Sequence, residues 1–224
     1  IARSNDTYFY KTAEWLGPNQ LAQTARLYGL GQPTGIELAA EADGLVPDPA
    51  WKEKTLGEPW YLGNTFHFGI GQGDVLVTPI QIAQMVQAIA NNQTLCTPSL
   101  IKETTPKCRD LGVSAEATNI VLSGMIAACS DGGTGYPLFQ FNRTHFQPGS
   151  IQDKLAAGMV ACKTGTAEFG AADSRGYRRT HAWFVAIVPT AKILEGQQLD
   201  AATATASAAV APSLLDLQQL RVTW

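Results

Sequence analysis

Two strand-like segments beyond residue 158 constrain the fold most. Residues 159–168 and 180–188 have the composition of strands, and a polar, glycine-containing connection, residues 169–179, lies between them. A connection of that length predicts an antiparallel hairpin. Helical patterns precede the hairpin, so the sequence predicts an α/β (α+β) fold that combines an antiparallel sheet with a helical subdomain.

Capping residues mark four expected helices. Asp6 and Asn19 are the predicted N-caps of two successive helices, which a Gly-Pro pair separates. Thr78 precedes a proline and an apolar stripe with helical spacing, and Ser114 is expected to begin a fourth helix. Residues 31–63 are rich in Gly, Pro and Trp and show no sustained period, so they are predicted to form an ordered loop.

Composition excludes several classes of protein. A chain of 224 residues with 45% hydrophobic content can bury a sizeable core. A net charge of −3 gives no sign of a nucleic-acid partner. No apolar stretch approaches the roughly 20 residues of a membrane helix, and the first residues lack the layout of a signal peptide. The four cysteines lack C-x-x-C spacing, and the three histidines lack paired-ligand spacing, so we expect neither a metal nor a cofactor.

A Lys-Thr-Gly-Thr sequence lies on the first predicted strand. The ammonium of Lys163 and the hydroxyls of Thr164 and Thr166 attract and bind a carboxylate, while Gly165 lets a ligand backbone approach closely. The N–H of Thr166 is a candidate oxyanion donor. Taken alone, the motif also fits an exposed strand with a solvated lysine.

Ser4, Asn5 and Asp6 precede the first helix, where such residues ordinarily serve as caps. Their combination with a distant Lys-Thr-Gly on a strand is more specific. A Ser-x-Asn or Ser-x-Asp element at a helix start, followed far downstream by Lys-Thr-Gly, resembles the layout of penicillin-recognising serine acyl-transferases.

Further motifs narrow the resemblance to class B penicillin-binding proteins, and among these to the cell-elongation type. The matching segments follow the family's order and spacing from residue 1 to residue 189. They are Ser4-Asn5-Asp6-Thr7-Tyr8-Phe9-Tyr10, Thr34-Gly35-Ile36, Gly44-Leu45-Val46-Pro47, Ile70-Gly71-Gln72-Gly73, Thr78-Pro79-Ile80-Gln81, Gly132-Gly133-Thr134, Lys163-Thr164-Gly165-Thr166-Ala167-Glu168 and His181-Ala182-Trp183-Phe184. The resemblance implies the fold shared by serine β-lactamases and penicillin-binding transpeptidases.

The resemblance implies a D,D-transpeptidase that cross-links peptidoglycan stem peptides through a serine acyl-enzyme. Lys163, Thr164, Gly165 and Thr166 then correspond to the elements that bind the substrate carboxylate and the oxyanion. Ser4 corresponds to the proton-relay serine.

The sequence departs from the family pattern in three places. Asp6 replaces an asparagine that is common in the family, and its carboxylate, unless it is itself neutral, is expected to favour the protonated state of the lysine in the family's Ser-x-x-Lys motif. In the family, the nucleophilic serine lies in a Ser-x-x-Lys motif several tens of residues before the position of Ser4. The only Ser-x-x-Lys motif in this sequence begins at Ser99, in a segment that the resemblance places away from the site. Residues 190–224 diverge, and 208–220 only loosely resemble the family's closing helix. We therefore expect residues 1–189 to be a partial transpeptidase domain that lacks its N-terminal part.

The resemblance also implies partners and a location. The substrates are stem peptides ending in D-Ala-D-Ala, and β-lactams act as acylating analogues. A membrane glycosyltransferase and the cell-wall elongation complex are the expected protein partners. The expected location is the extracytoplasmic face of the cell membrane, with an anchor outside this chain.

Two other functions stay open at this point. One is a non-catalytic module that binds peptides or β-lactams as a sensor. The other is a related hydrolase, either a class D-like β-lactamase or a D,D-carboxypeptidase. The long segment from residue 31 to residue 73 argues against a compact β-lactamase.

The cysteines leave several pairings open. An extracytoplasmic location permits disulfides, and the candidates are Cys108–Cys129, Cys96–Cys108 or no bridge at all. Cys162 precedes Lys163 on the predicted strand, so its side chain is expected to point to the opposite face and to be buried.

Overall fold

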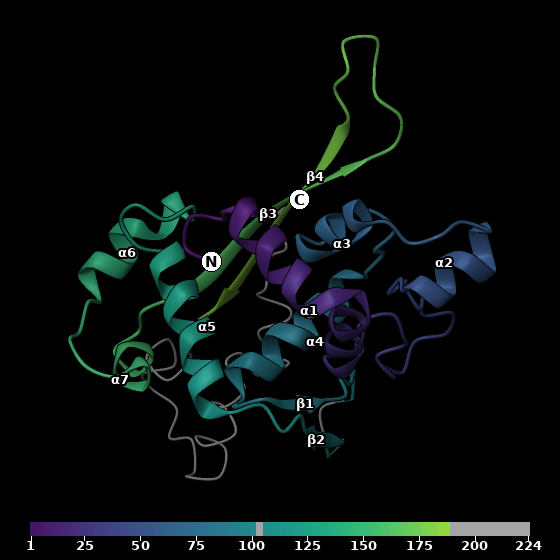
Figure 1. The fold of residues 1–224 in the computed structure, drawn as a ribbon. Helices are drawn as coiled ribbons and strands as arrows, with labels where there is room; N and C mark the ends of the chain where they lie inside the picture. Colours follow the sequence, from purple (N-terminus) through teal and green to yellow (C-terminus); the bar gives the residue numbers. More distant parts are fainter. Residues whose placement is uncertain (102–104, 189–224) are drawn as a thin grey trace.

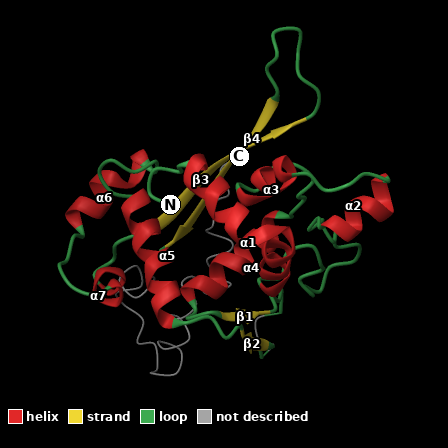
Figure 2. Ribbon diagram, viewed as in Figure 1, coloured by secondary structure: helices red, strands yellow, loops and turns green. Residues whose placement is uncertain are grey.

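The computed structural model describes residues 1–101 and 105–188, and shows helices packed against one face of a long hairpin (Figures 1 and 2). The helices are α1 (Asp6–Leu27), α2 (Pro49–Leu56), α3 (Leu62–Gly69), α4 (Pro79–Ala90), α5 (Ala115–Ala128), the 3-10 turn η1 (Tyr136–Leu138), α6 (Phe139–Thr144) and α7 (Ile151–Ala156). The strands are β1 (Thr94–Cys96), β2 (Cys108–Asp110), β3 (Ala161–Phe169) and β4 (Arg179–Ile187). The closing helix expected at 208–220 lies outside the described residues, so the division at residue 189 stays a prediction.

The predicted hairpin is confirmed. Strands β3 and β4 pair antiparallel, with Lys163 opposite Val185 and Gly165 opposite Trp183. The tip of the hairpin projects beyond the helices in Figure 1. The inner half of the hairpin is buried, because α5 packs on β3 and α4 packs on β4. The main core cluster joins these elements through Val86, Leu122, Met125, Ile126, Met159, Ala161 and Ile187.

The helices beginning after Thr78 and Ser114 are confirmed. The Thr78 hydroxyl accepts a hydrogen bond from the N–H of Gln81, and the Gln81 side chain accepts one from the N–H of Thr78. These two hydrogen bonds form a capping box at the start of α4. The Ser114 hydroxyl accepts from the N–H of Ala117 at the start of α5. Both helices therefore begin at the residue that the sequence predicts.

The first predicted cap is wrong by one residue. Asn5, and not Asp6, is the N-cap of α1, because its side-chain oxygen accepts from the N–H of Tyr8 at 3.0 Å. Asp6 is instead the first helical residue, so its carboxylate is not used in capping. The expected interruption does occur at Gly17, whose φ of 76° and ψ of 163° are not helical, so α1 consists of two helical segments that meet at a kink, as the Gly-Pro pair predicts.

The loop expected at residues 31–63 contains helical structure, so that prediction is wrong in part. Asp48 caps α2, and Pro49 occupies its first turn. Helix α3 begins at Leu62 and packs on α1, where Gly69 lies against Ala13. Helix α2 gives no apolar periodic signal, because the residue that it buries is the charged Lys52.

The structure contains two disulfides, one of which is a pairing considered from the sequence. Cys96 and Cys108 occupy opposed positions on β1 and β2, so this candidate is confirmed. The Cys108–Cys129 pairing is wrong, since Cys129 bonds to Cys162 across a Cα–Cα distance of 5.7 Å. Cys162 is fully buried, as its position predicts. Among the described residues, no helix is both long enough and apolar enough to cross a membrane.

Candidate active site

The ammonium of Lys163 and the hydroxyl of Ser4 lie in direct contact. Lys163 Nζ donates to Ser4 Oγ at 2.9 Å, although the two residues are 159 positions apart. Lys163 is the third residue of β3, and Ser4 directly precedes Asn5, the N-cap of α1. The same ammonium donates to the carbonyl oxygen of Thr164 at 2.5 Å. The two residues thus lie as close together as the sequence analysis expects, and the roles assigned to them stay a prediction.

Ser4 adopts a conformation that few residues other than glycine accept. Its φ of 49° lies in the left-handed region, which costs a non-glycine residue about 1–3 kcal/mol. The turn is closed by a hydrogen bond of 3.1 Å from the N–H of Ser4 to the carbonyl of Ile1. The fold therefore accepts local strain at the residue that points its hydroxyl at Lys163, as is common at functional sites.

The charge state of Lys163 depends on two opposed effects. Burial lowers the pKa of the half-buried ammonium, and the negative charge of Asp6 raises it by a smaller amount, so the pKa of Lys163 lies below its ordinary value. Asp6 thus acts on Lys163 through space from the first position of α1. The sequence analysis expects Asp6 to act on the lysine of the family's Ser-x-x-Lys motif, so its effect on Lys163 is an additional finding.

Thr164 is fixed by a residue that the sequence analysis did not select. Its hydroxyl donates to the hydroxyl of Thr134 at 2.7 Å. Thr134 ends a Gly-Gly-Thr loop that turns back onto the end of α5, where a Cβ on Gly133 would collide with the carbonyl of Ala128. The Gly-Gly-Thr motif was the available signal, but nothing in the sequence indicated which strand residue it contacts.

The outer edge of β3 presents backbone groups on the side away from β4. The N–H of Glu168 donates to Oε1 of Gln72 at 3.2 Å, so this N–H points away from the hairpin partner. N–H directions alternate along a strand, so the N–H of Thr166 points to the same edge. In the described part of the chain, β3 has β4 as its one strand neighbour, which leaves this edge open for an extended ligand. Gln72 is a second contact that the sequence analysis missed, although its Gly-Gln-Gly turn was noted.

The site therefore brings together Ser4, Asp6, Lys163 and Thr164 as expected, with the open edge at Thr166 next to them. The Ser99 hydroxyl makes a different contact, donating to the carboxylate of Glu37 at 2.6 Å, while Lys102 lies outside the described residues. No group of three or more His, Cys, Asp or Glu side chains suited to a metal occurs within residues 1–101 and 105–188. These groups can bind an anion, pair with the backbone of an extended ligand, and transfer a proton between a hydroxyl and an ammonium.

Comparison with known proteins gives consistent matches. The family described as "Penicillin binding protein transpeptidase domain" matches residues 1–216. The peptidoglycan D,D-transpeptidase MrdA of Salmonella typhimurium is 31% identical over 224 residues, which covers 91% of this chain and 35% of the relative. The chain thus spans about a third of the length of that relative.

Solved structures agree with the sequence matches. Pseudomonas aeruginosa PBP2 in complex with WCK 5153 superposes with a TM-score of 0.68 at 30% identity, covering 100% of this chain and 49% of that one. The complex between PBP2 and MreC from Helicobacter pylori gives a TM-score of 0.68 at 30% identity, covering 84% of this chain and 32% of that one.

Proposed function

The chain belongs to the penicillin-binding protein transpeptidase family, and on this premise we propose that it serves a D,D-transpeptidase reaction that cross-links peptidoglycan stem peptides. The observation that carries the proposal is the contact of 2.9 Å between Lys163 Nζ and Ser4 Oγ beside an open strand edge. An ammonium, two hydroxyls and free backbone groups on one edge suit a peptide that ends in a carboxylate.

Substrate binding is assigned to β3. The stem peptide lies along the outer edge of the strand, and its terminal carboxylate meets Lys163 and the hydroxyls of Thr164 and Thr166. Gly165 leaves room for the ligand backbone because it has no side chain. The N–H of Thr166 faces the carbonyl under attack and stabilises the oxyanion that develops there.

Proton transfer is assigned to Ser4. In the family's reaction, a serine of a Ser-x-x-Lys motif attacks the penultimate D-Ala carbonyl and the terminal D-Ala leaves as an amine. Ser4 passes a proton to that amine and recovers one from its lysine neighbours, so the hydroxyl ends the step unchanged. An amine of a second stem peptide then takes the acyl group and regenerates the serine. The role of Asp6 is to keep Lys163 charged despite its burial.

Partners and location follow the same family argument. The Helicobacter pylori relative is solved in complex with MreC, which supports a place for this chain in a cell-wall complex. A membrane glycosyltransferase is the further partner that we propose from the family resemblance. We place the reaction on the extracytoplasmic face of the cell membrane. The two disulfides support that location, because such bonds persist in oxidising compartments.

Labelled penicillin tests the proposal. The protein made from the complete reading frame that encodes this chain is expected to form one covalent adduct, which Lys163→Ala slows by about 10²-fold or more. Lys54→Ala, which removes an exposed lysine of α2, is the matched control and leaves labelling unchanged.

Three results would count against the proposal. Binding of penicillin without an adduct would favour the sensor alternative, and rapid release of hydrolysed penicillin would favour a β-lactamase. The 224-residue chain alone is expected to form no adduct, because its single Ser-x-x-Lys begins at Ser99, away from Lys163. An adduct on Ser99 would require a different active site.

A further inference from the structure

The disulfide between Cys129 and Cys162 lies directly beside the proposed site. Cys162 is the residue before Lys163 on β3, and Cys129 is the C-cap of α5. Both cysteines are fully buried. We propose that this bridge is a positioning element for acyl transfer, which holds the Thr134 loop against β3 and so fixes Thr164 and Lys163. The inference rests on the proposed function.

The bridge and the Thr134–Thr164 hydrogen bond join the same two segments. Side chains on a strand alternate between faces, so Cys162 and Thr164 point to one face of β3 and Lys163 points to the other. On the opposing segment, Thr134 follows Cys129 by five positions. The bridge and the hydrogen bond therefore act as two consecutive cross-links along one side of the strand.

The loop that carries Thr134 packs closely on one sulfur of the bridge. The N–H of Gly135 donates to the carbonyl of Ala128 at 2.7 Å, which returns the loop to the end of α5. A Cβ built on Gly135 would lie 2.6 Å from Cys162 Sγ, so the backbone of the loop rests on the bridge. Since the loop packs on the bridge itself, breaking the bond moves the surface that supports Thr134.

A shift of the loop reaches Lys163 through Thr164. The Thr164 carbonyl accepts from Lys163 Nζ, and the Thr164 hydroxyl donates to Thr134. The position of this one residue thus sets where the ammonium lies relative to Ser4. Displacement of catalytic groups by about 1 Å can cost about 10²-fold in rate.

A separate anchor keeps the start of β3 in place without the bridge. The buried side chain of Asn142 makes two hydrogen bonds to the backbone of Val160, at 2.7 and 2.8 Å. Ala161 is part of the main core cluster. We therefore expect variants without the bridge to fold. Their defect is expected to be a displacement of Thr164 and Lys163 within the site.

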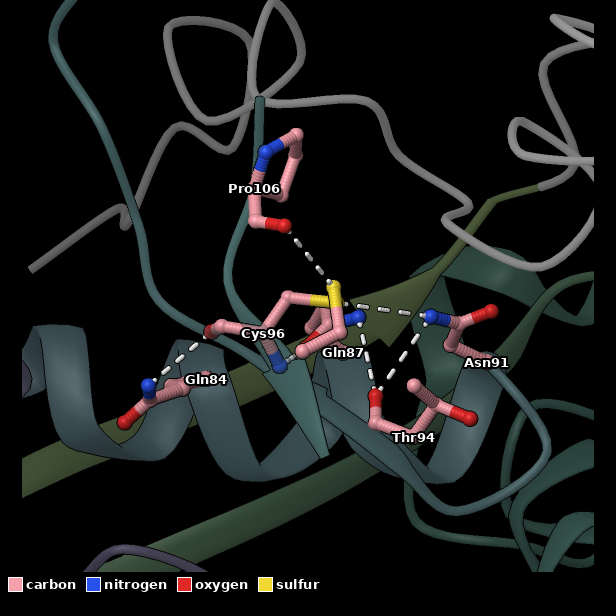
Figure 3. The surroundings of a disulfide bond; sticks show 7 residues. Gln84, Gln87, Asn91, Thr94, Cys96 and Pro106 are labelled. Atoms are coloured by element: carbon pink, nitrogen blue, oxygen red, sulfur yellow. Dashed lines mark hydrogen bonds between the residues drawn. A yellow bond between two sulfur atoms is a disulfide. The ribbon is translucent and has the colours of Figure 1, made fainter. Parts of the chain in front are cut away.

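The second disulfide provides a matched control. Cys96–Cys108 joins β1 and β2, on the side of the molecule away from the hairpin tip (Figure 1). Its surroundings are backbone and amide groups of α4 and β1, with Gln84 donating to the carbonyl of Cys96 at 2.9 Å (Figure 3). Removing it takes away a bridge without touching β3.

The experiment measures penicillin acylation of Cys129→Ala, Cys162→Ala, their double variant and the Cys96→Ala/Cys108→Ala control. Each protein is made from the complete reading frame and assayed well below its own unfolding temperature. The acylation rate is measured over a range of penicillin concentrations, so that the maximal rate and the apparent affinity for penicillin are obtained separately. We expect the maximal rate to fall tenfold to hundredfold in both single variants and equally in the double variant, because all three lack the same bond. The control is expected to match wild type.

Reduction of the bridge gives an independent arm. In the Cys96→Ala/Cys108→Ala background, Cys129–Cys162 is the one disulfide of this chain that dithiothreitol can reduce, and its reduction is expected to lower the rate to that of the bridge-free variant under the same conditions. If neither bridge-free form folds, Thr134→Val tests the same link with the bond intact and is expected to lower the maximal rate to a similar extent.

Two outcomes would overturn the inference alone. These are a folded bridge-free protein that acylates at the wild-type rate, and a control variant that loses as much rate as the Cys129 and Cys162 variants. A wild-type protein that takes up no penicillin would overturn the proposed function, and the inference with it.

Discussion

The carboxamide of Asn142 pairs with both backbone groups of Val160. Its Nδ2 donates to the Val160 carbonyl at 2.8 Å, and its Oδ1 accepts from the Val160 N–H at 2.7 Å. Asn142 is 1% exposed and lies on α6, so a helix remote in sequence holds the strand that carries Lys163.

The first prediction follows from this pair. Asn142→Ala leaves two buried backbone groups of Val160 without partners, and we expect the free energy of unfolding to fall by about 2–4 kcal/mol. Gln140→Ala, at an exposed position of the same helix, is expected to change it by less than about 0.5 kcal/mol. Urea unfolding measures both, and equal losses would contradict the role given to Asn142.

The second prediction concerns the pKa of Lys163. Asp6→Asn removes the charge that favours the ammonium, so the pKa of Lys163, already lowered by burial, is expected to fall further. Between the folded and unfolded pKa values the unfolded chain binds more protons, so the contribution of Lys163 to stability increases as pH rises through that window. A ¹³Cε NMR titration of Lys163 measures the shift, with Glu116→Gln on α5 as control. An unchanged or higher pKa in Asp6→Asn would show that Asp6 does not act on Lys163.

The third prediction separates activity from stability at Ser4. Ser4→Ala and Ser4→Gly both remove the hydroxyl, and both are expected to slow acylation by about 10²-fold or more. Glycine accepts the φ of 49° freely, so Ser4→Gly is expected to raise the free energy of unfolding by about 1 kcal/mol relative to Ser4→Ala. Ser123→Ala, at an exposed position of α5, is the control for both measurements. Normal acylation in either Ser4 variant would rule out the proton relay.

The fourth prediction tests the packing of α1 on α3. A Cβ at Gly69 would lie 2.5 Å from the Cβ of Ala13, so Gly69→Ala is expected to destabilise the protein by about 1–3 kcal/mol. Gly63 is in the same helix with no atom within 4 Å of an added Cβ, so Gly63→Ala is expected to stabilise it by up to about 1 kcal/mol. Thermal unfolding compares the two. The same sign of change in both variants would contradict the close approach at Ala13.

The fifth prediction concerns the cysteine pairing. A digest of unreduced protein is expected to contain the linked peptides Cys96–Cys108 and Cys129–Cys162, with all four thiols appearing only after reduction. Mass spectrometry of digests before and after reduction identifies the links. A Cys108–Cys129 peptide, or four thiols titrating in unfolded, unreduced protein, would show that the pairing is wrong.

Local signals were sufficient for the elements that bury the core. Helix α4 has a capping box and a proline in its first turn, which both indicate its start, and an apolar stripe that indicates the helix itself. The hairpin was predictable because two strand-like segments flank a polar connection of ordinary length. Helix α2 was missed because a short polar helix has little hydrophobic periodicity, although Asp48 and Pro49 did mark its start.

The contacts of the site depend on tertiary structure and were predictable only through the family resemblance. No local pattern relates Ser4 to Lys163, and the expectation that they meet came from motif order. The Cys129–Cys162 bond had no such support. The two cysteines are separated by 33 positions, and the segment between them includes α6 and α7, whose path the sequence spacing does not specify. Thr134 and Gln72 were missed for the same reason.

The separation of 159 positions between Ser4 and Lys163 also has a kinetic consequence. Closing so long a segment costs entropy that only the intervening packed elements can offset, so this contact forms late in folding. We therefore expect partially folded forms to lack the site. On the proposed function, covalent labelling of the protein made from the complete reading frame would count only molecules that have reached the native state. Penicillin would then serve as a folding probe that reports the joining of the chain's first turn to the β3–β4 hairpin.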